Sequence, residues 1–250
     1  MAAPAISVAT SFTPIHLPNP RIPIQNPRTR QLPISRRRSP AVGAAPASQS
    51  VSSSEFLRAK ADLLRLISDQ ERGLRTQTDP SKRGEIIGAI DELAAHGEGT
   101  NTTGPSLSCT WRMLWTTEKE QLFIIKNAGF FGTQTGDVLQ VIDVEKGLLN
   151  NVITFPPSGV FFVRSSIEPA PPQRINFRYL IASQHLCFQY RNECLGFTSA
   201  VLRWGTWEIP LPPFGRGWFE SVYMDGEIRV AKDIRGDYLV VDRAPYSWKE

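Results

Sequence analysis

The stretch WFESVYMDGEIRVAKDIRGDYLVVD, residues 218–242, decides the fold class. It contains three short runs in which apolar and polar residues alternate: 218–224, 228–232 and 238–242. The runs are joined by Asp225-Gly226 and by Arg235-Gly236, and glycine in such dipeptides permits the tight turn of a β-hairpin. Because successive side chains of a strand point to opposite faces, the stretch predicts an antiparallel meander with one buried face.

The same alternation appears upstream, from residue 107 onward. Five residues share one expected face of a strand over 107–115: Leu107, Cys109, Trp111, Met113 and Trp115. Further strand candidates lie at 122–126, 138–144, 151–155, 159–165, 174–183 and 185–190. Eight or more short strands without intervening helices predict an up-and-down β-barrel or a sandwich.

The segment 197–218 interrupts this pattern. It carries large aromatic residues among prolines and glycines, including Trp204, Trp207, Phe214 and Trp218. Proline cannot donate a ladder hydrogen bond, so the segment is not expected to form a central strand. We expect a loop that either closes one end of the barrel or carries ligand contacts, and the sequence leaves both roles open.

Two amphipathic helices are expected before the strands, within 52–96. Ser52 with Glu55 three positions later is typical of a capping box at a helix start. Asp79 as the N-cap residue and Pro80 at the first helical position predict the start of the second helix. The apolar stripes of these helices either pack against the barrel or bind a membrane surface; their ordinary width and mixed charges favour packing.

The first 50 residues differ in composition from the rest. Six of the 28 Lys and Arg residues precede Glu55, the first acidic residue, and the remaining 22 are balanced by 24 acids. The net charge of +4 therefore comes from the leader and does not indicate a nucleic-acid-binding surface. A leader rich in Ser, Pro, Ala and Arg is typical of a chloroplast transit peptide, so residues 1–50 are expected to be disordered and cleaved. A disordered regulatory tail is the alternative.

Catalytic and metal-binding motifs are scarce. The sequence contains no G-x-S-x-G, no H-E-x-x-H and no Gly-rich phosphate or dinucleotide loop. Beyond the leader, His96 and His185 are interpreted as surface or structural residues, and His185, Cys187 and Cys194 lack the paired spacing of a zinc site. We therefore expect no catalytic residue, no metal and no cofactor. The purest apolar runs have four residues, far short of the ~20 that a helix needs to cross a membrane.

Three segments resemble motifs of the plastid-lipid-associated protein (PAP/fibrillin) family. Residues 110–117, TWRMLWTT, resemble W-x-L-x-Y-T-T, and residues 138–151, VLQVIDVEKGLLNN, resemble the strand pair Q-x-I-D…N. Residues 222–236 resemble T-Y-L-D-x-x-L-R-I-S-R-G, although Ala-Lys-Asp stands in place of S-R-G. Over about residues 55–242 the chain is thus similar to a divergent member of that family.

The resemblance implies a mainly β fold, a lipocalin-like antiparallel β-barrel at 107–243 with two short helices packed on or beside it, in a fibrillin domain spanning 51–245. It implies a non-enzymatic chloroplast protein of plastoglobules, thylakoid surface or stroma that binds or sequesters isoprenoid quinones, carotenoids or fatty acids. Its partners would be a hydrophobic small molecule or lipid, a peripheral membrane or lipid-body surface, and a plastid enzyme, with no nucleic acid. The alternatives are a structural coat or adaptor protein for lipid bodies or for a lipid or isoprenoid biosynthetic enzyme, and an enzyme of unrecognised type.

Candidate ligand-binding residues are those expected to face the interior or the mouth of the barrel: Trp111, Met113, Trp115, Gln140, Ile142, Phe177, Tyr179, Trp218 and Tyr223. Large apolar side chains suit a packed core equally well, so the sequence leaves open whether the barrel is hollow or filled. The resemblance also places Arg229, on a late strand, over Trp111 on the first strand as a structural contact at the closed end.

Overall fold

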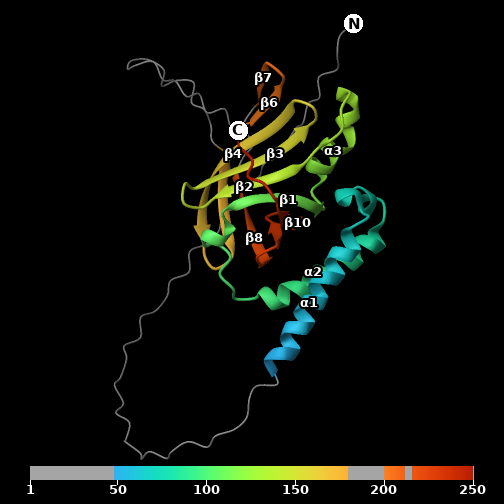
Figure 1. Ribbon diagram of the computed structural model, residues 1–250, viewed down its shortest axis with the longest axis vertical. Coiled ribbons are helices and arrows are strands. Elements are labelled where there is room, and N and C mark those ends of the chain that lie inside the picture. Colours follow the sequence, from blue (N-terminus) through green and yellow to red (C-terminus); the bar gives the residue numbers. More distant parts are fainter. Residues whose placement is uncertain (1–47, 180–199, 212–215, 250) are drawn as a thin grey trace, which may run out of the picture. The chain divides into compact units, whose positions relative to one another are not determined.

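An eight-stranded antiparallel barrel forms the centre of the fold. The computed structural model describes residues 48–179, 200–211 and 216–249. The strands follow one another around the barrel in the order β3-β2-β1-β10-β9-β8-β5-β4, and pairing of β4 with β3 closes it (Figure 1). Their bounds are β1 Cys109–Thr116, β2 Val138–Asp143, β3 Leu148–Phe155, β4 Gly159–Ala170, β5 Arg174–Tyr179, β8 Arg216–Met224, β9 Ile228–Asp233 and β10 Tyr238–Arg243. The expected mainly β, lipocalin-like barrel with short helices is confirmed.

The β4 strand is long enough to pair with two strands along one edge. Residues 159–163 pair with β6 (Ala200–Trp204), whereas residues 165–170 pair with β5. The β7 strand (Trp207–Leu211) pairs with β6 and ends the sheet. The expectation of a loop over 197–218 is therefore wrong for residues 200–211, which form a hairpin, and for residues 216 and 217, which belong to β8. Pro210 is tolerated because β7 is an edge strand, whose outer side has no ladder partner.

Residues 122–126, expected as a strand, instead lie in a helix, α3 (Lys119–Asn127). The preceding strand β1 is already paired on both edges, with β2 and with β10, so no ladder position is open beside it. A helix buries Leu122, which is 1% exposed, while Phe123 points to solvent at 67% exposure. Tertiary pairing thus overrides the β propensity of this short apolar run.

Two N-terminal helices cover part of the outer face of the barrel. They are α1 (Ser48–Ile67), which begins four residues before the expected Ser52, and α2 (Pro80–Gly97). The predicted start of α2 is confirmed: the Asp79 Oδ1 atom accepts a hydrogen bond from the Lys82 backbone N–H at 2.9 Å. Apolar side chains of both helices form one cluster with six buried barrel residues: Trp115, Tyr223, Ile228, Val230, Tyr238 and Val240. Packing against the barrel is therefore the observed arrangement of these helices.

Two β-bulges determine which side chains reach that cluster. The ladder between β1 and β10 shifts between Met113 and Trp115, and the ladder between β8 and β9 shifts between Ser221 and Tyr223. A bulge inserts one extra residue and so reverses the inward–outward alternation beyond it. The single face expected from Leu107 to Trp115 consequently ends at Met113, and Trp115 lies under the helices.

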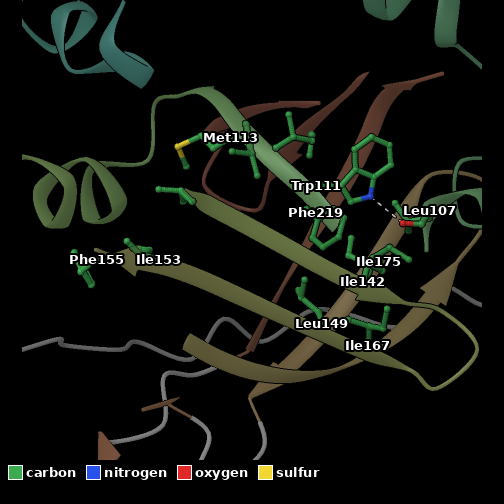
Figure 2. Close-up of a cluster of buried hydrophobic side chains, with 14 of the residues drawn as sticks. Leu107, Trp111, Met113, Ile142, Leu149, Ile153, Phe155, Ile167, Ile175 and Phe219 are labelled. Atoms are coloured by element: carbon green, nitrogen blue, oxygen red, sulfur yellow. Dashed lines mark hydrogen bonds between the residues drawn. The ribbon is translucent and has the colours of Figure 1, made fainter. Parts of the chain in front are cut away.

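The barrel interior is packed at one end. Figure 2 shows Trp111, Ile142, Leu149, Ile167 and Ile175 gathered around the end of β1 near Leu107, whose carbonyl oxygen accepts a hydrogen bond from Trp111 Nε1 at 2.9 Å. Met113, Ile153 and Phe155 lie towards the opposite end in the same view. Within the described ranges, no helix combines the length and the apolar character that a membrane crossing requires.

Candidate functional site

A cavity of about 410 Å³ lies in the barrel at the end opposite the packed one. Apolar side chains from five strands form most of its wall: Met113, Val138, Ile153, Phe161, Val163, Leu239 and Val241. The α3 helix contributes Gln121 and Ile124, and charged groups around them are Glu118, Glu120 and Arg235. A smaller cavity of about 100 Å³ shares part of this lining and extends to Phe177 and Phe219. The volume of the larger cavity falls within the range of small-molecule sites, roughly 300–1,000 Å³.

A fully buried arginine lies inside the same barrel. Arg229 has 0% exposure, and its Cζ atom is 5.3 Å from the ring centres of Trp111 and of Phe219. Its Nη2 atom donates to Gln140 Oε1, its Nη1 atom donates to Ser221 Oγ at 3.5 Å, and its Nε atom has no partner among the described residues. Burial lowers the pKa of Arg229 to about 9, so the side chain still carries its charge at neutral pH. The expected contact between Arg229 and Trp111 is present.

Two amides connect this arginine to the cavity. Gln140 and Asn151 are cross-strand partners on β2 and β3, and both line the larger and the smaller cavity. The Gln140 Nε2 atom donates to Asn151 Oδ1 at 3.0 Å. A continuous hydrogen-bonded chain therefore runs from the buried guanidinium of Arg229 to the cavity surface. Ser165, also on an inward-facing position, has a buried hydroxyl without a partner among the described residues.

The charged groups at the cavity include one carboxyl with a strongly shifted pKa. The pKa of Glu118 is raised to about 7, chiefly by burial and in part by the nearby carboxylates of Asp233 and Asp237. Gln121 Nε2 donates to Glu118 Oε2 at 2.6 Å, and this hydrogen bond favours the ionised form. The Arg235 guanidinium is shared with other acids, because Nη1 lies 2.6 Å from Glu120 Oε1. Glu118 thus titrates near neutral pH at the lining of the cavity.

The described lining of both cavities combines apolar walls with a few polar groups. It contains no histidine, cysteine or serine, and its polar groups are amides, carboxyls and one arginine. The described residues also contain no cluster of His, Cys, Asp or Glu that fits a metal ion. Apolar walls with a few convergent polar groups are typical of sites that hold a hydrophobic molecule and orient one end of it.

Comparison with known proteins identifies the family of this chain. The chain matches the PAP_fibrillin family over residues 57–242. The chain belongs to that family. It is also 65% identical over 193 residues to "Probable plastid-lipid-associated protein 11, chloroplastic" from Arabidopsis thaliana, a match that covers 77% of this chain and 82% of the relative. No solved structure matches the chain. The predicted family is confirmed, and the relationship assigns this fibrillin to the chloroplast.

Five of the nine candidate residues of this fibrillin lie together on the lumen side. Trp111 and Ile142 belong to the packed interior, and Met113 and Gln140 line the larger cavity. Phe177 packs against the interior cluster and lines the smaller cavity. Their positions follow from the two-residue period of β1, β2 and β5, which is regular in these parts of the strands.

Three other candidates face away from the lumen. Trp115 and Tyr223 lie beyond the bulges and contact the helices, and Trp115 Nε1 donates to Thr76 Oγ1 at 3.2 Å. Trp218 precedes the inward-facing Phe219 and therefore points outward, where the Arg174 guanidinium lies 4.2 Å from its ring centre. The Tyr179 side chain, like the segment with His185, Cys187 and Cys194, lies outside the part of the chain that the structure describes.

Sequence reasoning missed most of the cavity wall. The missed residues are Val138, Asn151, Ile153, Phe161, Val163, Leu239 and Val241. Alternation from Gln140 would have found Val138 and, across the ladder, Asn151, because cross-strand partners share a face. The four-residue runs at 160–163 and 238–241 are apolar on both faces, so their sequence alone does not distinguish inward from outward positions.

Proposed function

We propose that this fibrillin binds or sequesters a hydrophobic molecule in its barrel and catalyses no reaction. The observation that carries this proposal is the apolar cavity of about 410 Å³ between the strands and α3. Burial of apolar ligand surface there would supply roughly 25 cal/mol per Å² before the entropic cost of binding. The relative's name connects that protein with plastid lipids, and the ligand classes proposed here are isoprenoid quinones, carotenoids and fatty acids at plastoglobules or thylakoids.

Filling the cavity tests this function directly. Val163 lines the cavity, whereas Val160 on the same strand points to the outer face and is half-buried. We expect Val163→Phe to lower the affinity for a bound lipid by at least about tenfold, and Val160→Phe to leave it unchanged. Lipids that co-purify with the native protein would be identified by mass spectrometry, and their affinities measured by displacement of a fluorescent fatty acid. Equal lipid content in both variants would contradict binding in the barrel.

A coat or adaptor role on lipid bodies is the second candidate, and one surface feature favours it. Trp207 and Ile209 on the edge strand β7 are 76% and 50% exposed. Indole side chains are enriched at membrane–water interfaces because one end is apolar and the other polar. Trp207→Ser with Ile209→Ser should then weaken flotation with vesicles of plastid galactolipids while leaving binding in the cavity intact. Flotation unchanged by the double substitution would exclude this hairpin as the contact.

A further inference from the structure

The orientation of both cavity amides follows from the chemistry of Arg229. A guanidinium has only donors, so the Gln140 atom that it contacts must be the carbonyl oxygen. The other end of Gln140 is then an NH₂ group, and the Asn151 atom 3.0 Å from it must be an oxygen. This leaves the NH₂ group of Asn151 as the remaining end of the chain. Because Asn151 lines both cavities, its NH₂ group can donate hydrogen bonds to a ligand in them.

The charge behind these donors has no counter-ion among the described residues. Arg229 contacts two rings, an amide and a hydroxyl, and no carboxylate pairs with it there. Buried cations are normally paired, because an isolated charge loses its hydration without compensation. The guanidinium also polarises the amides in series, which makes the Asn151 N–H groups stronger donors.

We infer that the cavity binds a single-chain amphiphile with a carboxylate head, which accepts hydrogen bonds from Asn151 and is oriented towards the charge of Arg229. Its hydrocarbon chain would lie along Met113, Ile153 and Phe161, which line the rest of the cavity. This inference rests on the proposed function and adds to it the head-group chemistry and the direction in which the ligand lies. Arg229 is here a positioning residue that acts through Gln140.

One isosteric substitution tests the inference. Asn151→Asp keeps an oxygen for Gln140 Nε2 to contact, removes the donors and adds a negative charge at the cavity surface. Asn150, its neighbour on β3, points to the opposite face, so Asn150→Asp is a matched control with the same change in net charge. Affinities would be measured at pH 8 for a long-chain fatty acid and for the primary alcohol of equal chain length.

For the wild-type protein and for Asn150→Asp, we expect the acid to bind at least about tenfold more tightly than the alcohol. Asn151→Asp should lose this preference by weakening acid binding while the affinity for the alcohol stays within about twofold. Equal binding of acid and alcohol by the wild-type protein would overturn the head-group assignment and leave the proposed function standing. If a short-chain prenylquinone bound more tightly than the acid, the Asn151 N–H groups would be donors to a neutral carbonyl oxygen of the ligand. The inference of a carboxylate head would then be wrong. Failure of the wild-type protein to bind any of the three compounds would count against the proposed function itself.

Discussion

At the residue scale, Arg229 combines a desolvated charge with stacking on two rings, and the balance of these effects decides its contribution. Stacking of a guanidinium on an aromatic ring contributes about 0.5–2 kcal/mol, and loss of its hydrogen bonds leaves Gln140 Oε1 unsatisfied. We expect Arg229→Ala to lower the free energy of unfolding by about 1–3 kcal/mol, and Arg229→Lys to restore only part of this because Lys lacks the planar fork.

Denaturant melts of Arg229→Ala, Trp111→Phe and the double variant measure the contact between these two residues. Interaction energies of residues in contact deviate from additivity, so a non-zero coupling term is expected. Arg112→Ala is the comparison, because Arg112 forms a partly exposed ion pair with Asp242 at 2.6 Å and should contribute no more than about 1 kcal/mol. Additive effects in the Arg229 cycle would show that stacking on Trp111 contributes nothing.

Glu118 is expected to make the stability of the folded chain depend on pH. Its pKa is about 7 in the folded chain, against about 4.3 for an exposed glutamate in the unfolded chain. Between these values the folded state holds a proton that the unfolded state lacks, so this group's stabilising contribution is complete below pH ~4 and is lost as pH rises through 7. Glu118→Gln should therefore be more stable than the wild type by about 1–2 kcal/mol at pH 8, with little difference near pH 4.

Thermal melts between pH 4 and pH 8 would reveal this difference as two curves that diverge with rising pH. The carboxyls that act on Glu118 are those of Asp233 and Asp237, and Arg235 opposes them. A constant offset between the variant and the wild type across the whole pH range would show that Glu118 does not titrate near neutrality.

At the scale of elements, the bulge in β1 assigns Trp115 to the contact between helices and barrel. Trp115 is fully buried against α1, α2 and the outer side of β8–β10, and its indole N–H contacts Thr76. Trp115→Phe should cost about 1–2 kcal/mol of stability through the lost hydrogen bond and volume, without a change in lipid affinity. Trp218→Phe, on the outer face beneath Arg174, should change stability by no more than about 0.5 kcal/mol. If Trp115→Phe lowered the lipid affinity at unchanged stability, Trp115 would contribute to ligand binding as the sequence had suggested.

The elements also show how far local patterns predict this fold. The hairpins of β8–β10 were predictable because turn dipeptides and a period of two are local properties of the chain. The β-bulge at Leu114 could not be predicted from the sequence, because the alternation of apolar residues continues through it. The α3 helix was missed for a related reason: Leu122–Ile125 favours a strand locally, and only the full pairing of β1 excludes it. The cavity lining was likewise hidden, because its residues come from strands that meet only in the closed barrel.

At the scale of the molecule, β9 and β10 are buried on both faces. Ala231 and Leu239 point into the barrel, whereas Val230 and Val240 lie beneath the helices. Strands covered on both faces are expected to read as nearly continuous apolar runs, as Tyr238–Val241 does. The helices thus form a second layer over the barrel. Without them, this face of the barrel would present a large apolar patch to water.

Two truncations distinguish the contribution of residues 1–50 to folding from that of the helices α1 and α2. A variant lacking residues 1–50 loses only the first three residues of α1, and among the α1 side chains whose burial the structure describes, from residue 55 onward, Ala59 is the first buried one. We therefore expect it to keep a single cooperative thermal transition and its lipid affinity, while import into isolated chloroplasts is lost. A variant lacking residues 1–106 also loses α1 and α2, which uncovers Trp115, Tyr223, Val230 and Val240 together, and we expect it to aggregate. Loss of the cooperative transition in the shorter truncation would show that the leader belongs to the folded domain, because its removal leaves the described contacts between helices and barrel in place.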